Sequence, residues 1–405
     1  MDTITHGILG ALIGKAFFAP DPPRNGVSWR EPPQTPGRVA IVATTLGAIF
    51  PDIDVFAGPL AHNSLAIMTW HRNITHSLVI LPIWALLLAA ITQWLARQIR
   101  WPAPGFTDLA AIYAVGLASH IFLDLITAFG TMIRAPLNYA RPAWDWVFIV
   151  DLSVTSLVLL PQLAAWAFQR PKRAPYRALP LWALCSGAAF LVSALVQRME
   201  VPFPYEAAAG VAAIFAIFLV LPLRRGMGTR VGRAKWCRVG VALVGAYLAF
   251  AAAMHHSALQ QVTEFASENH VPAQSIAALP MPPSPALWAG LIATPDIIYR
   301  LQFNELVQEP VKFQVFPQAA PNRFIDAARQ LRDVQTFLWF ARFPLFQYSE
   351  RDGQSIVQII DLRYYGMRAG AQPSSSMSTP RSNFAFQVVF APDGHVISHG
   401  FLRQE

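Results

Sequence analysis

Histidine and aspartate residues recur together in four short segments near the start of the chain. The segments read DTITHG, PDIDVF, WHRNITHS and SHIFLD, in that order. Imidazole and carboxylate groups together suit zinc, and they also suit manganese or iron. The candidate ligands that the four segments supply are His6, Asp52, Asp54, His71, His76, His120 and Asp124.

His120 and Asp124 form the most informative pair. Residues four positions apart lie on one face of a helix, and this pair falls in the later part of a long apolar run. An ionisable side chain inside a membrane segment is costly and needs a partner, which a metal ion would supply. A His–Asp hydrogen bond that fixes helix packing is the alternative, and the pair alone leaves both interpretations open.

The other candidates are weaker when each is taken alone. Asp52 and Asp54 follow Pro51 at an expected helix end, where a solvated loop is the ordinary alternative. A single histidine such as His71 or His76 at the start of an apolar run is commonly an interfacial aromatic residue. These segments therefore support a metal site only if the fold brings them together.

Further polar residues could support such a centre. Arg72 could bind an anionic substrate group, most naturally a phosphate, although an ordinary interfacial arginine is the alternative. Thr75, Asp145 and Asp151 are expected beside the ligands, and Asp151 would be either a further ligand or a residue that orients a ligating histidine. For Asp151 the alternative is an acid that pairs across helices and serves packing.

The composition indicates that a bundle of membrane helices positions these residues. The 405 residues are 54% hydrophobic and only 13% charged, whereas soluble domains carry about 25% charged residues. Runs of about 20 apolar residues are long enough to span a bilayer. Strong candidates are 75–96, 106–129, 146–168, 178–197, 205–223 and 238–259, and weaker ones are 3–19 and 38–50. The predicted fold is mainly α, a polytopic bundle of six to eight apolar helices.

Basic residues orient the predicted bundle. They concentrate near 97–100, 170–177 and 224–238, in every second loop, as the positive-inside rule requires. Membrane orientation thus accounts for the net charge of +8 without a nucleic-acid partner. With these loops in the cytoplasm, all seven candidate ligands lie at the outer ends of helices, although they took no part in the assignment. This convergence favours one metal centre over four unrelated coincidences.

The remaining chain has a different pattern. We divide the sequence into a membrane domain at 1–259, a linker at 260–290 and a small extramembrane α+β domain at 291–405. Asp352-Gly353 and Asp393-Gly394 each separate two strand-like runs and predict hairpins, and 322–341 has helical spacing. This domain is expected on the outer, periplasmic side.

Taken as an ordered set, the motifs resemble a known family. MDTITHGILGALIG, PDIDVF, HRNITHSL, SHIFLDLITAFGT and DWVFIVD are similar to the YdjM-like family of bacterial membrane-bound metal-dependent hydrolases. The resemblance implies an inner-membrane protein with a metal centre built from the seven ligands named above. A more distant likeness of the His-x-x-x-Asp pair to zinc-dependent phospholipase C favours phosphoester substrates.

The resulting hypothesis is an enzyme. Divalent ions, most naturally zinc, would activate water for attack on a phosphoester or lipid-linked substrate at the outer leaflet. Asp52 and Asp54 would bridge metals or act as the base, and membrane lipid would be the surrounding partner. The alternatives are a metal-ion transporter or sensor with the same ligands, and a non-catalytic membrane scaffold.

Overall fold

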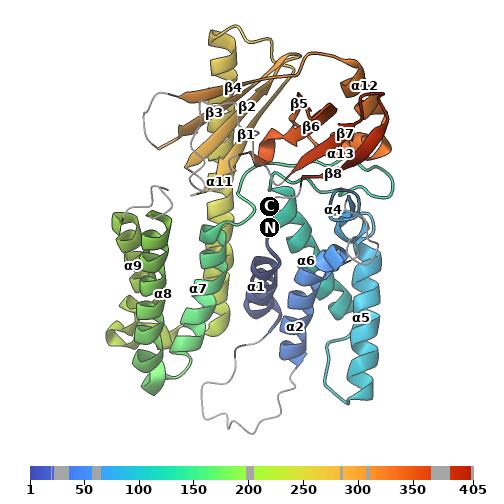
Figure 1. Ribbon diagram of the computed structural model, residues 1–405. Coiled ribbons are helices and arrows are strands. Elements are labelled where there is room, and N and C mark those ends of the chain that lie inside the picture. The colour runs from blue at the N-terminus through green and yellow to red at the C-terminus, as the bar shows by residue number, and fades with distance from the viewer. Residues whose placement is uncertain are drawn as a thin grey trace.

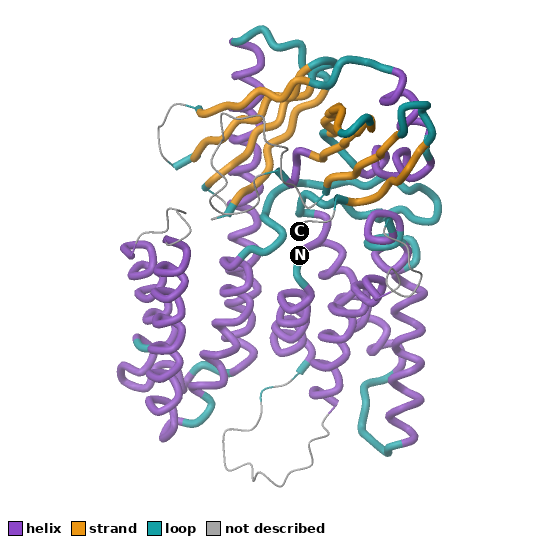
Figure 2. Tube along the Cα trace, viewed as in Figure 1, coloured by secondary structure: helices purple, strands orange, loops and turns teal. Residues whose placement is uncertain are grey.

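A computed structural model describes residues 1–19, 21, 36–56, 65–197, 205–282, 286–306, 311–365 and 384–402. Helices form one part of the molecule, and two antiparallel sheets lie at one end of it (Figures 1 and 2). The prediction of a mainly helical chain with strands in its C-terminal part is confirmed.

Apolar helices make up the membrane part. They are α1 (Thr3–Ile13), α2 (Pro36–Ile49), α4 (Ala66–Thr69), α5 (Leu81–Gln98), α6 (Phe106–Leu125), α7 (Leu152–Phe168), α8 (Ala174–Gln197), α9 (Tyr205–Leu219), α10 (Met227–Arg230) and α11 (Arg233–Glu268). Within the described residues, five helical segments are long and apolar enough to cross a membrane, and a bent pair would make a sixth. The expected bundle of six to eight apolar helices is therefore not established at that number.

The span expected at 146–168 is shorter in the structure. Helix α7 begins at Leu152 because Asp151 is its N-cap, and the Asp151 carboxylate accepts hydrogen bonds from the backbone of Ser153 and Val154. Residues 146–151 therefore belong to the preceding loop.

Glycines let three helices approach closely at the centre of the bundle. A Cβ added at Gly10 of α1 or at Gly116 of α6 would lie 2.6 Å from the carbonyl oxygen of Thr44 in α2. Small residues at such contacts are how membrane helices pack backbone against backbone. Helix α2 is thus held between α1 and α6, which fixes the ends of all three helices relative to one another.

A sharp break precedes α5. The segment Ala66–His76 and the helix Leu81–Gln98 meet at 73°. Arg72, within the first of these segments, has φ of 61°, in the left-handed region. This break directs residues 71–76 across the end of the bundle instead of along its side.

Two four-stranded antiparallel sheets form the C-terminal part. One contains β1 (Ser275–Met281), β2 (Leu287–Ala293), β3 (Ile297–Asn304) and β4 (Lys312–Pro317), paired in chain order. The other contains β5 (Pro344–Arg351), β6 (Gln354–Asp361), β7 (Ala385–Phe390) and β8 (Val396–Phe401). The predicted hairpin at Asp352-Gly353 is confirmed, with φ of 52° and 74° at the two turn residues. The predicted hairpin at Asp393-Gly394 is also confirmed and joins β7 to β8.

Two expectations about this part were wrong. Most of the expected linker at 260–290 has regular structure, because α11 continues to Glu268 and both β1 and β2 lie within or across that range. Buried apolar residues of α11, such as Val262, pack against β1 and β2, which explains the continuation. The single helix expected at 322–341 is α12 (Arg323–Gln330) followed by α13 (Arg332–Phe340), because Leu331 is extended.

The C-terminal part packs on the bundle through arginines and an apolar cluster. Arg363, which is buried, pairs with Asp361 at 2.6 Å and donates to the carbonyl oxygens of Ala128 and Phe340. Phe129 lies in the same apolar cluster as Phe337 of α13. Since these loop residues directly follow α6, the sheets are anchored beside the C-terminal end of that helix.

We predict that Arg363→Met loosens this anchor. Asp361 is fully buried, so loss of its partner leaves an uncompensated charge, which costs about 3–5 kcal/mol. Pulse proteolysis in urea should show cleavage of the C-terminal part at lower denaturant concentration. Arg351→Met is the control, because Arg351 is 81% exposed beside Asp352. Equal resistance of the two variants would contradict the assigned role.

Candidate metal centre

Four buried side chains from three elements meet at the end of the bundle that faces the sheets. Asp52 lies in the 3₁₀ turn Phe50–Phe56 after α2, and His76 ends the turn Ile74–His76. His120 and Asp124 lie one helical turn apart near the end of α6. One ligand atom from each residue lies within 4.8 Å of the others, so this buried group could hold a metal ion.

The spacing of these atoms resembles the edges of a coordination tetrahedron. His76 Nε2 lies 3.0 Å from His120 Nε2 and 3.2 Å from Asp124 Oδ2. Asp52 Oδ1 lies 3.4 Å from His120 Nε2 and 3.7 Å from His76 Nε2. Four ligands at zinc–ligand distances of about 2.0–2.1 Å would lie roughly 3.3 Å apart. The donor set and its size therefore fit a zinc-sized cation.

Outer hydrogen bonds direct both histidines toward the same point. His120 Nδ1 donates to the carbonyl oxygen of Ala48 at 2.7 Å, since a carbonyl can only accept. His76 Nδ1 faces Asp54 Oδ2 at 3.2 Å and Thr75 Oγ1 at 3.0 Å. These contacts direct both Nε2 atoms to one point between the two carboxylates, where a cation could bind. Such outer partners are typical of metal-binding histidines.

A second group shares His76 and is less buried. It contains Asp54, His71 and His76, and it could also hold a metal ion. Asp54 Oδ1 lies 2.8 Å from His71 Nδ1, and its other oxygen accepts hydrogen bonds from the Thr75 hydroxyl and the Arg72 backbone. The His71 side chain is 16% exposed, whereas that of His76 is fully buried. The second group thus lies nearer the surface than the first and shares His76 with it.

Asp124 is the most heavily compensated residue of the centre. Arg72 Nε lies 2.9 Å from Asp124 Oδ2, and Arg72 Nη1 donates to the Asp124 carbonyl oxygen and to Thr127. His6 Nε2 lies 3.2 Å from Asp124 Oδ1, and its ring stacks on His120. The backbone nitrogen of Met1 also contacts this oxygen.

These contacts change the roles expected for two residues. Arg72 is only 1% exposed, so its guanidinium balances Asp124 and is not available to an incoming phosphate. His6 contacts the outer oxygen of Asp124 and does not belong to either ligand group of the described residues. Sequence could not distinguish these positions, because they depend on the break before α5 and on where α1 starts.

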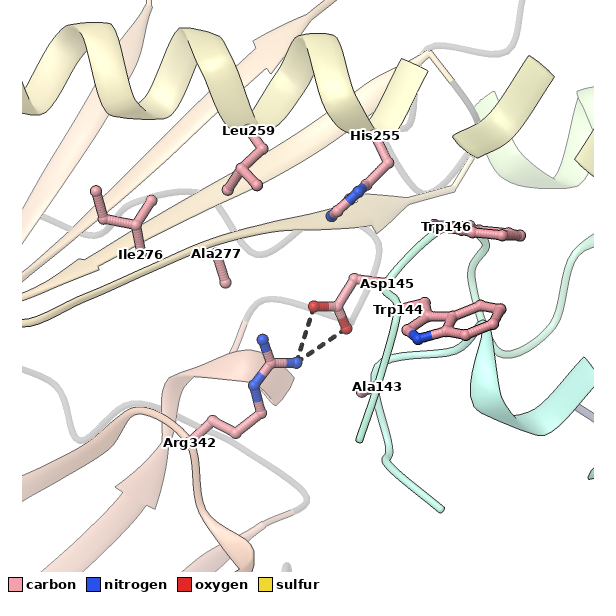
Figure 3. A pocket seen from close by; sticks show the side chains of 9 residues that line it. All are labelled: Ala143, Trp144, Asp145, Trp146, His255, Leu259, Ile276, Ala277 and Arg342. Atoms are coloured by element: carbon pink, nitrogen blue, oxygen red, sulfur yellow. Dashed lines mark hydrogen bonds and ion pairs between the residues drawn. The ribbon is translucent and has the colours of Figure 1, made fainter. Parts of the chain in front are cut away.

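Two residues expected beside the ligands have other partners. Asp151 caps α7 and accepts a hydrogen bond from the Tyr247 hydroxyl of α11. Asp145 pairs with Arg342 of the C-terminal part (Figure 3). Burial raises the pKa of Asp145, and the guanidinium of Arg342 acts in the opposite direction. Neither residue joins the metal-binding groups, whereas Thr75 does contact both His76 and Asp54 as expected.

Sequence reasoning missed two supporting groups. The Thr3 hydroxyl donates to Asp52 Oδ2 at 2.5 Å, and the Ala48 carbonyl orients His120. Thr3 lies in the same DTITHG motif as His6, so the motif itself contained a signal. A backbone carbonyl leaves no signal in a sequence.

We predict that Thr75→Val weakens metal binding. The change removes the hydroxyl that links Asp54 to His76, and loss of such an outer partner typically lowers metal affinity about 10–100-fold. Competition with a zinc chelator would measure the affinity of the purified protein. Thr92→Val is the matched control, because Thr92 instead bonds Tyr113 between α5 and α6. Identical affinities for both variants and the original protein would contradict the assignment.

Comparisons with known proteins agree with the membrane character of this region. The family model described as YdjM inner membrane protein matches residues 1–201. The protein YfhP of Bacillus subtilis, described as uncharacterized, is 28% identical over 138 residues, which are 34% of this chain and 38% of that protein. No solved structure matches the chain. The resemblance found in the sequence motifs is thereby confirmed: residues 1–201 match the YdjM inner membrane protein family.

Proposed function

We propose that this chain is a membrane-bound metal-dependent hydrolase that acts on a phosphoester or lipid-linked substrate. The observation that carries the proposal is the pair of imidazoles whose Nε2 atoms face one another at 3.0 Å beside two carboxylates. A divalent cation would bind between these four side chains, and the mixed nitrogen and oxygen donors favour zinc, with manganese or iron as further candidates.

The proposed roles follow from burial. Asp52, His76, His120 and Asp124 would hold the ion, which when bound lowers the pKa of water and polarises the ester oxygen. His71 and Asp54 lie on the more exposed side. Donation from His71 Nδ1 to Asp54 leaves Nε2 as an acceptor, so His71 could take a proton from the reacting water. Arg72 would keep Asp124 ionised and in place.

The orientation of the protein is part of the proposal. The basic segments follow α5, α7 and α9, whose ends lie opposite to the sheets (Figure 1). The positive-inside rule then places the metal centre and the C-terminal part at the outer, periplasmic face of the inner membrane. A site at that level would receive a substrate from the outer leaflet, which is why lipid or a lipid-linked phosphoester is the proposed substrate class.

Metal content and activity test the proposal together. Asp52→Asn keeps the side-chain size, His120→Asn replaces the ring with a smaller polar side chain, and both spare the Arg72–Asp124 pair. We expect near-stoichiometric zinc, manganese or iron in the original protein by elemental mass spectrometry, and loss of most of it in both variants. Hydrolysis of a phospholipid or a chromogenic phosphoester should fall by at least about 100-fold, since the ion supplies the nucleophile.

His270→Asn is the control, because His270 is exposed beyond α11. Absence of metal in folded original protein, even after incubation with each ion, would refute the hydrolase and favour the non-catalytic scaffold. Metal that is bound but moves across reconstituted vesicles without any hydrolysis would favour a transporter.

We predict that the C-terminal part is accessible from the periplasm. Arg351→Cys places a thiol at the exposed end of β5, and Arg97→Cys places one at the basic end of α5, both in a Cys185→Ala/Cys237→Ala background. A membrane-impermeant maleimide applied to cells with a permeabilised outer membrane should label the first and not the second. The reverse labelling pattern would overturn the orientation.

A further inference from the structure

A cavity separate from the metal-binding groups lies where the helices meet the sheets. It has a volume of about 360 Å³ and is bounded by the loop that precedes α7, by α11, by β1 and by Arg342 before β5 (Figure 3). Trp144, Asp145 and Trp146 come from the loop, and His255 comes from α11. Apolar side chains such as Leu259 and Ile276 form the rest of the wall.

The cavity holds hydrogen-bond donors that remain unused among the residues the structure describes. Arg342 donates through Nη1 to both oxygens of Asp145, at 2.9 and 2.8 Å. Its Nε and Nη2 have no such partner there, and its side chain is 33% exposed. The ring nitrogens of His255 and the indole nitrogens of Trp144 and Trp146 also lack hydrogen bonds within this part of the chain. Several free donors around one cavity suit an anion with several acceptor oxygens.

The position along α11 places the cavity at the level of lipid headgroups. At about 1.5 Å per residue, the helix rises about 26 Å from the basic end at Arg238 to His255, and the hydrocarbon core is about 30 Å thick. Trp144 is 40% exposed and lies 4.9 Å from Trp146, and tryptophans gather at this interface. Leu152, just beyond in the sequence, is 65% exposed and offers an apolar surface for a chain.

We propose that this cavity binds the phosphodiester headgroup of a membrane phospholipid. The phosphate oxygens would accept from the unused nitrogens of Arg342 and from His255, and Trp144 would border the glycerol and the upper acyl chain. Asp145 neutralises one side of the guanidinium and fixes its orientation without covering its other donors. The site does not depend on the proposed hydrolase activity, because none of its residues belongs to the metal-binding groups.

A bound lipid would join the two parts of the molecule. Trp144 and Trp146 donate backbone hydrogen bonds to Leu125 and Ile126 at the end of α6, whereas Arg342 belongs to the C-terminal part. The headgroup would therefore contact groups from both sides of the junction. Its binding should stabilise the docked arrangement as well as the local loop.

Native mass spectrometry of the delipidated full-length protein tests the proposal. We titrate phosphatidylglycerol, diacylglycerol with the same chains, and inorganic phosphate as a competitor. One phosphatidylglycerol should bind at least about tenfold more tightly than diacylglycerol, because charge-assisted hydrogen bonds to the phosphate are lost in the latter. Inorganic phosphate at the same concentration should not displace it. Equal binding of the two lipids, or ready displacement by phosphate, would overturn the assignment.

Variants locate the site. Asp145→Asn/Arg342→Gln removes both charges together, and His255→Leu removes the ring nitrogens while keeping the ion pair. Both should weaken the tight phosphatidylglycerol binding, the first by about tenfold or more, with metal content unchanged. Arg134→Gln is the control, since Arg134 is an exposed arginine on the same loop. If the double variant fails to fold, His255→Leu still tests the site. A phosphatidylglycerol affinity of that variant equal to that of the original protein would refute the site.

Discussion

Asp124 places a carboxylate inside an apolar helix bundle, and the rest of the site is arranged around the need to compensate it. An isolated buried charge would cost more than the net stability of a typical domain. Its compensating groups come from separate segments, namely Arg72 before the turn Ile74–His76, His6 from α1, and His120 from α6 itself. The close glycine contacts of α1, α2 and α6 make this convergence sterically feasible. The groups that compensate Asp124 and the closest helix contacts therefore involve the same helices of the bundle.

Sequence predicted the meeting of these residues better than their individual roles. The i to i+4 spacing of His120 and Asp124 and the charge bias of the loops were sufficient to place the four segments at one end of the bundle. The division into a buried group and a more exposed group could not be predicted, because it depends on a 73° break before α5. The pairing of Arg72 with Asp124 depends on the same break, so an arginine that could have met substrate is instead buried. The partners of Asp145 and Asp151 could not be predicted, because nearness in sequence says little about partners that lie in α11 or in the C-terminal part.

The fold was predictable where residue patterns are strong. Long apolar runs identified the main helices, and Asp-Gly turns identified two hairpins. The first sheet was only partly predicted because β2, with the sequence LWAGLIA, is buried at nearly every position and shows no alternation. The extension of α11 was obscured by the loss of apolar character after residue 259, where the helix faces the sheet with a few buried residues such as Val262 and Ala266.

Helix α11 runs without interruption from Arg233 to Glu268, which is about 54 Å at about 1.5 Å per residue. One continuous helix therefore extends from the basic end of the bundle to the first sheet. No hinge separates its lower portion from the portion that packs against β1 and β2. A helix embedded in a bilayer tilts when the thickness of the bilayer changes. In this molecule such a tilt would move the first sheet, whose buried residues share an apolar cluster with those of the second, and Arg342 before β5 is paired with Asp145 in the loop after Asp124. A change in bilayer thickness would therefore be expected to reach the end of the bundle where the candidate ligands lie.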